Sequence, residues 1–249
     1  MSETSRLKPR PFLPARTPKA PRLLPAAVVL LLAAVIVADL FSLYAGTRAH
    51  DLLDWEGGFA YASMEDWDAA DTLYRRAWMF QYQAVIVCGI VFIAWFHRMY
   101  RSAVALAPDR LRTGTGWAIG AWLFPVLNLW RPFRIALDMW GVCVPASTST
   151  STSASTSASA SVSASAPAPA AGQPAEVAFW PVGLWWGLFV TSGAFNQYAG
   201  WTYGRAEAIP DLRDATVLLM AADVLDIAAA AAAIHFVVRL TSMLRRRTS

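Results

Sequence analysis

The sequence predicts an all-α integral membrane protein with four transmembrane helices, a short re-entrant or broken helix and an interfacial helix. Of the 249 residues, 56% are hydrophobic and only 15% are charged, whereas about a quarter of the residues are charged in soluble domains. Apolar runs near the roughly 20 residues needed to cross a bilayer recur along the chain. The net charge is +4, but the basic residues gather at the ends of these runs. Membrane topology explains that distribution, so nucleic acid is not expected as a partner.

The first span is expected at residues 23–45, after a basic, proline-rich segment at 1–22 that we interpret as a disordered cytoplasmic tail. The run is too long for the apolar core of a cleaved signal peptide. The tail is interpreted as a positive-inside topology signal rather than as a binding segment for anionic lipid or a proline-rich ligand. Asp39 is the single charged residue of the span. We expect it to form an ion pair with Arg75 or Arg76 at the start of the next span.

The second span is expected at 77–96, after an acidic loop that we place outside the cell. Ser63 is followed three residues later by Asp66, a spacing typical of a helix start, so the second helix should begin in this loop. The helix should end at Pro108, because proline disfavours helical geometry in the residue before it.

The apolar run at 117–130 is expected to enter and leave the membrane on the cytoplasmic side. At about 1.5 Å per residue it reaches only roughly 21 Å, which is short of the roughly 30 Å hydrocarbon core. Pro125 lies inside the run and frees backbone carbonyl groups that need other partners. An amphipathic pattern then predicts an interfacial helix at 132–144. The whole membrane region is placed at 23–146.

A membrane hairpin is expected at 176–240, with spans at 179–199 and 215–238, after a low-complexity Ser/Thr/Ala/Pro linker at 147–175. Gly183 and Gly187 form a small-residue face that should allow close approach of the final span. Basic residues are concentrated on one side most strongly if 117–130 re-enters the membrane. Both termini, the linker and the basic tail at 241–249 are therefore predicted to be cytoplasmic, in a multi-pass protein of the cell membrane.

The strongest functional feature is a pair of carboxyl groups in the last span, Asp223 and Asp226. They are three residues apart and so share one helix face. A carboxylate in lipid is costly unless it is protonated, paired or lining a wet cavity. Two interpretations stay open: a polar membrane site for a cation or protons, formed with Asn128 and Pro125 of the broken segment, or polar contacts that hold the helices together.

No catalytic motif is recognisable, and we expect neither enzymatic activity nor a cofactor. The glycines of the GTGWAIG segment have the wrong spacing for a dinucleotide site, and the three histidines are scattered. Cys88 and Cys143 lie far from any metal-ligand pattern, so we interpret them as packing residues and expect no metal.

Three motifs resemble a family of bacterial integral membrane proteins described as domain of unknown function 4328. They are W-F-H-R-x-Y-R from Trp95, G-W-A-I-G-x-W-L-F-P-x-x-N-L-W-R-P from Gly116 and G-L-W-W from Gly183, and the match covers roughly residues 80 to 240. The motif residues are Trp95, Arg98, Arg101, Trp117, Trp122, Pro125, Asn128, Trp130, Pro132, Trp185 and Trp186. The resemblance implies a membrane protein and lends no activity.

Two functions are consistent with these features. The first is a non-enzymatic scaffold, sensor or interaction module that binds the lipid bilayer and either a protein partner or further copies of itself. The alternative is a small transporter or ion or proton conduit that uses the broken segment 117–130 and the Asp223/Asp226 face. We favour the module because it requires less of the individual residues.

Overall fold

The described part of the protein, in a computed structural model, is built from seven helices and contains no strand. It comprises residues 23–54, 58, 61–109, 111, 114, 116–123, 125–143 and 179–248. The helices are α1 (Leu23–Leu52), α2 (Met64–Leu106), α3 (Trp117–Leu123), α4 (Pro125–Asn128), α5 (Arg131–Cys143), α6 (Trp180–Tyr203) and α7 (Ile209–Thr248). The tail at 1–22, the linker at 147–175 and the last residue of the tail at 241–249 lie outside the described residues.

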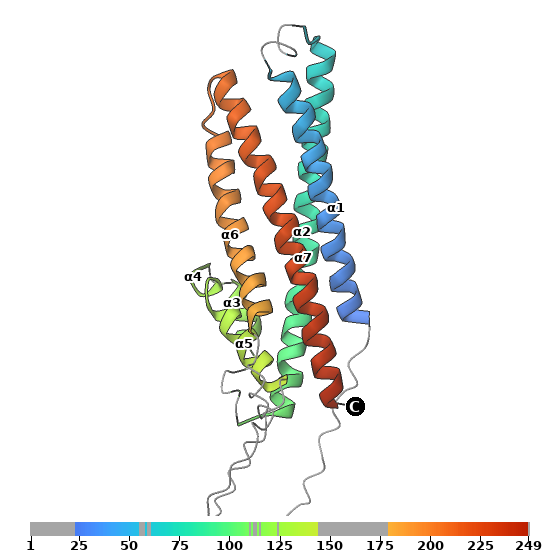
Figure 1. The fold of residues 1–249 in the computed structure, drawn as a ribbon, viewed down its shortest axis with the longest axis vertical. Coiled ribbons are helices and arrows are strands. Elements are labelled where there is room, and N and C mark those ends of the chain that lie inside the picture. The colour runs from blue at the N-terminus through green and yellow to red at the C-terminus, as the bar shows by residue number, and fades with distance from the viewer. Residues whose placement is uncertain are drawn as a thin grey trace, which may run out of the picture.

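Four long helices form an antiparallel bundle (Figure 1). α1 packs along both α2 and α7, and α6 packs along α7, which gives the lateral order α2, α1, α7, α6. The start of α1 and the end of α7 lie at the same end of the bundle (Figure 1). The prediction that the last two long helices are antiparallel neighbours is confirmed.

The predicted spans 23–45, 77–96 and 215–238 each lie inside one helix, and the span 179–199 begins at the N-cap residue of α6. All four helices extend beyond the C-terminal ends of these spans. α1, α2 and α7 are long and apolar enough to cross a membrane. α6 has 24 residues but is not one of these three, because its Trp, Tyr, Asn and Gln side chains lower its mean hydropathy. At about 1.5 Å per residue α2 is roughly 65 Å long, about twice the hydrocarbon thickness. It therefore projects beyond the apolar layer.

The start and end of α2 follow local sequence signals. The Ser63 hydroxyl accepts a hydrogen bond from the Asp66 backbone N–H at 3.2 Å, and the Asp66 carboxylate accepts one from the Ser63 N–H at 2.9 Å. This reciprocal capping box is the expected helix start. At the other end Ala107 caps the helix just before Pro108, as predicted.

The segment 117–130 contains the short helices α3 and α4, which lie on either side of residue 124 and beside the lower part of α6 (Figure 1). With seven and four residues, α3 and α4 reach only about 10 Å and 6 Å. The Trp186 indole N–H donates to the Leu129 carbonyl oxygen at 3.1 Å, so a backbone carbonyl just after α4 is satisfied by a neighbouring helix. α5 follows at the position predicted for the interfacial helix.

Stacked rings join the broken segment to the bundle. The Trp185 and Phe236 rings are parallel, with centroids 4.4 Å apart, and the Trp122 ring meets Phe92 edge-on at 5.7 Å. Such ring pairs add to the apolar burial that they accompany. We call this set the aromatic core, and its members are Phe92, Trp95, Phe96, Trp122, Phe133, Trp140, Trp185, Trp186, Phe189 and Phe236.

The prediction of a close helix contact through Gly183 and Gly187 is wrong. Both glycines are exposed, and a Cβ atom added to either would meet nothing within 4 Å. The bulky Trp185 and Trp186 occupy the buried face of α6 instead. The close approach lies between α1 and α7, where a Cβ on Gly46 would be 2.8 Å from the Met220 Cγ.

Candidate functional site

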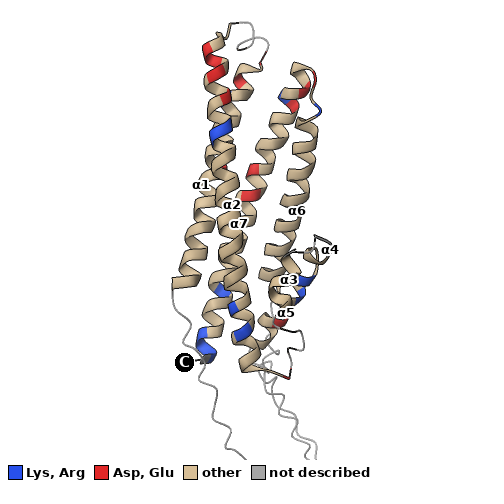
Figure 2. Ribbon diagram, turned by 180° about the vertical axis from the view of Figure 1, so that it is seen from behind, with Lys and Arg blue, Asp and Glu red and all other residues tan. Residues whose placement is uncertain are grey.

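Charge is distributed along the bundle in three zones (Figure 2). Acidic residues gather at the end formed by the start of α2, and basic residues gather at the opposite end. Between them the ribbon is almost uncharged, except for acidic residues on the middle of α7 (Figure 2). Uncharged helical surface between two charged ends is the pattern expected of a chain that crosses a bilayer.

The uncharged zone contains a side-chain network that links three helices. The Gln81 amide of α2 donates to the Asp39 Oδ1 of α1 at 2.9 Å and to the Asp223 Oδ1 of α7 at 2.8 Å. Asp39 is fully buried and Asp223 is 6% exposed. Ser42, one turn after Asp39, also interacts with the Asp223 carboxyl group. We call Asp39, Gln81 and Asp223 the carboxyl cluster.

Asp226 belongs to a neighbouring contact between α7 and α6. Its Oδ2 accepts a hydrogen bond from the Asn196 amide at 2.7 Å, and the same amide donates to the Ser192 carbonyl oxygen at 3.2 Å. Ser192 interacts with the Asp226 carboxyl group as well. Asp226 is also close enough to Asp39 and Asp223 to interact with them electrostatically. The two carboxyl groups predicted as a pair thus have different partners, Asp223 on α1 and α2 and Asp226 on α6.

The predicted ion pair of Asp39 with Arg75 or Arg76 is wrong. Arg75 pairs with Asp71 on the exposed side of α2, whereas Asp39 accepts its hydrogen bond from Gln81. The reason is that α1 continues to Leu52, so Asp39 lies about 20 Å from the end of its helix rather than one or two turns from it.

Asn128 and Pro125 do not join the carboxyl cluster. The residue after Asn128 accepts a hydrogen bond from Trp186 of α6, whereas Asp226 is bound by Asn196 of the same helix. The two contacts are made by Trp186 and Asn196, which are ten residues and therefore about 15 Å apart along α6. α4 begins at Pro125, and the Asn128 Oδ1 is buried without a hydrogen-bond partner among the described residues. The aromatic core occupies the region of the broken segment.

The tryptophans of the family motifs take part in packing contacts. Trp95, Trp122, Trp185 and Trp186 belong to the aromatic core, while Trp117 lies under the Arg131 guanidinium at 4.4 Å.

The remaining motif residues lie toward the basic end or around the broken segment. Arg101 and Trp130 are exposed, Arg98 is half-buried and Pro132 is buried. Trp130 has an exposed fraction of 52%. The motif therefore specifies a packed unit with an aromatic and basic outer surface.

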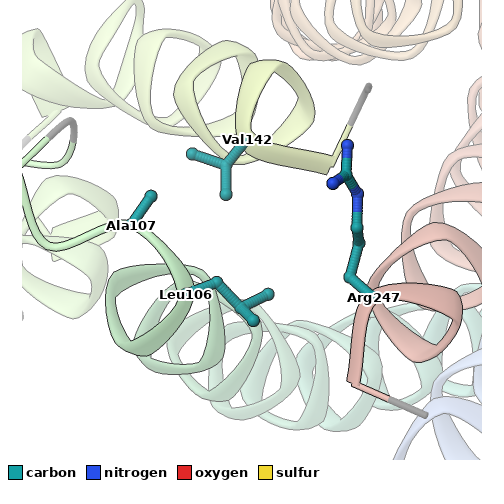
Figure 3. A pocket seen from close by; sticks show the side chains of 4 residues that line it. All are labelled: Leu106, Ala107, Val142 and Arg247. Carbon is teal, nitrogen blue, oxygen red and sulfur yellow. The ribbon is translucent and has the colours of Figure 1, made fainter. Parts of the chain in front are cut away.

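A small pocket lies at the basic end, where the ends of α2, α5 and α7 meet (Figure 3). Leu106, Ala107, Val142 and Arg247 line its volume of about 180 Å³. The Arg247 Nε donates to the Cys143 carbonyl oxygen at 3.4 Å, so the arginine caps the end of α5. Burial raises the pKa of the Cys143 thiol to about 11, with Arg247 opposing the shift. A thiol that stays protonated at neutral pH is a poor nucleophile.

Gln81 is the residue that sequence reasoning missed. An amide inside an apolar run needs a partner within the protein, which is the signal that could have found it. The sequence gives no means of choosing the partner, because Gln81 and Asp223 are 142 residues apart. No group of three or more His, Cys, Asp or Glu residues in the described ranges is arranged to hold a metal ion.

Comparison with known proteins supports the resemblance found in the tryptophan, proline and asparagine motifs. No curated protein and no solved structure matches the chain. The family model described as domain of unknown function matches residues 60–242, which include Gln81, Asp223 and the whole aromatic core but not Asp39. The chain therefore belongs to the DUF4328 family.

Proposed function

We propose that the protein is a non-enzymatic module of the cell membrane that holds or senses a partner at its basic, cytoplasmic end. The observation that supports this function best is the aromatic core. It packs the broken segment and α5 against α2, α6 and α7, and dense ring packing favours a fixed surface over an open passage.

The proposed orientation places the basic end inside the cell, in accordance with the positive-inside rule. α1, α2, α6 and α7 are the four proposed crossings. α6 has Trp180 near one end and Trp201 near the other, both exposed, as expected for a span with aromatic residues at both interfaces. Because α1 starts and α7 ends at the basic end (Figure 1), both termini are cytoplasmic in this orientation.

The proposed partner surface surrounds Trp130 and Arg131. Trp130 is 52% exposed, and the Arg131 guanidinium lies over the adjacent Trp117 ring. Exposed tryptophan and arginine side chains are the types most enriched among residues that dominate protein interfaces. The partner is a cytoplasmic protein segment or a second copy of the chain.

Photo-crosslinking in living cells tests this proposal. A photoreactive amino acid replaces Trp130 in one variant and Trp201 in the other. Trp201 is a matched control because it is also an exposed tryptophan, at 57%. An arginine–tryptophan contact is present at both places, between Arg131 and Trp117 near position 130 and between Arg205 and Trp201 itself, at 4.0 Å. We expect a discrete protein adduct from position 130 and none from position 201. Lipid adducts alone at both positions would contradict the proposal.

A conduit for ions or protons is the second candidate function, because buried carboxyl groups lie in the zone between the two charged ends of the bundle. Along α6, the Asn196–Asp226 contact lies about 15 Å from the Trp186–Leu129 contact at the broken segment, and the aromatic core lies on the basic side. We expect purified protein in liposomes to conduct protons and small ions no faster than liposomes without protein. Flux through the wild type that is lost in the double variant Asp223→Asn with Asp226→Asn would favour the conduit instead.

A further inference from the structure

Asp39 is the one member of the carboxyl cluster whose carboxyl group is only half satisfied. Its Oδ1 accepts a hydrogen bond from Gln81, whereas its Oδ2 is buried without a partner among the described residues. The side chain is fully buried. An ionised carboxylate would leave an acceptor oxygen unpaired in apolar surroundings, which is strongly unfavourable.

The charges around Asp39 have the wrong sign to stabilise an anion. Asp223 and Asp226 of α7 both interact with it electrostatically, and Tyr74 of α2 is the further titratable group that faces Asp223. The neighbours Ser42 of α1 and Gln81 of α2 are neutral, and so is Asn196 of α6, which binds Asp226. Arg75 pairs with Asp71 and Arg213 with Asp54, so neither of these arginines neutralises the three carboxyl groups.

None of the neighbours named above is a base, so a bound ligand would have to supply any positive charge at this site. The described residues offer no cluster of three or more metal-binding side chains, so the simplest ligand is a proton. A proton converts one carboxylate into a neutral carboxylic acid with an O–H donor and removes one negative charge from the low-dielectric interior. This step involves proton transfer from water only, with no oxidation or reduction.

We propose that Asp39 is a proton-binding residue, held as a neutral carboxylic acid while Asp223 carries the negative charge and Gln81 bridges them. The assignment follows from the geometry, because Asp39 has the unpaired oxygen and no exposure, whereas Asp223 is 6% exposed and has Ser42 as an additional neighbour. This inference is independent of the proposed function.

The bound proton stabilises the packing of α1 against its neighbours. Asp39 faces α2 and α7 at the level where Gln81 reaches both carboxyl groups. Loss of the proton would place two like charges across the contact between α1 and α7, within hydrogen-bonding reach of a single amide. Like charges that share a site resist joint ionisation. Release of the proton should therefore loosen α1, which lies before the residues matched by the family model.

Infrared spectroscopy of the protein in lipid vesicles at neutral pH tests the proposal through the C=O stretch of protonated carboxyl groups. The variants are Asp39→Asn, which resembles the neutral acid in size and charge, and Asp68→Asn, an exposed control on α2. We expect the wild type and the Asp68→Asn variant to show a carboxylic acid band that shifts in heavy water. In the Asp39→Asn variant, the carboxylic acid band should lose most of its intensity.

Two results would overturn the proposal. One is a wild type without a carboxylic acid band at neutral pH, a measurement that depends on no variant. The other is a band that survives in Asp39→Asn and disappears in Asp223→Asn, which would place the proton on the other carboxyl group. Thermal unfolding in detergent checks that the variants fold, and Asp39→Asn is expected to be at least as stable as the wild type.

Discussion

Replacement of Gln81 by leucine should destabilise the bundle, because this amide links α1, α2 and α7 at once. The substitution removes the bonds to Asp39 and Asp223, at 2.9 Å and 2.8 Å. It also leaves the two Oδ1 atoms without that donor. Side-chain hydrogen bonds in membrane proteins contribute about 0.6 kcal/mol on average and at most about 1.7, whereas bonds to charged groups reach about 1.5–3 kcal/mol.

Two bonds, one of them to a charged acceptor, give an expected loss of about 1–3 kcal/mol in the free energy of unfolding. Gln83→Leu is the matched control. Gln83 lies on the same helix, carries the same side chain and is exposed. Reversible unfolding of the purified protein in mixed micelles, followed by circular dichroism, measures both variants.

We expect Gln81→Leu to be less stable than the wild type and Gln83→Leu to be as stable or slightly more stable, since leucine suits a lipid-facing position better than glutamine. Equal stability of the two variants would refute the assignment of a structural role to Gln81.

Two further substitutions test the packing. Trp185→Ala removes a ring at the centre of the aromatic core and should cost about 3–5 kcal/mol of stability. Trp201→Ala, at an exposed position, should cost little. Thermal unfolding in detergent compares the two variants, and similar losses of stability would contradict the packing described. Gly46→Ala brings a Cβ to 2.8 Å from the flexible Met220 side chain and should lower stability by about 1 kcal/mol. Gly187→Ala, with nothing near the added atom, should be neutral, and a larger loss at position 187 than at 46 would show that the two faces have been misassigned.

The sequence was sufficient for features that depend on neighbours along the chain. Ser63 and Asp66 start α2 through contacts three residues apart, and Pro108 ends it within two residues. The shortness of α3 and α4 agrees with the short apolar run at 117–130. Such signals use short-range backbone chemistry, so they do not depend on the tertiary structure.

Features that depend on helix rotation could not be predicted in this way. Gly183 and Gly187 have the spacing of a close helix contact, but two adjacent tryptophans hold the opposite face of α6 toward the protein. The partner of Asp39 depends on how far α1 extends, and this helix continues beyond its apolar run to Leu52. Asp223 and Asp226 were identified as a pair from their spacing. Their separate partners, Gln81 and Asn196, depend on which helices adjoin α7.

The sidedness of the linker at 147–175 tests the four-span topology most directly. Ser155→Cys is introduced into a protein that lacks Cys88 and Cys143. Ala69→Cys, on the exposed acidic end of α2, is the control. Intact cells that express either variant are treated with a membrane-impermeant maleimide. The proposed topology predicts labelling at position 69 in intact cells and labelling at position 155 only after lysis. Labelling of position 155 in intact cells would contradict it, because the segment 117–130 would then have to cross the membrane.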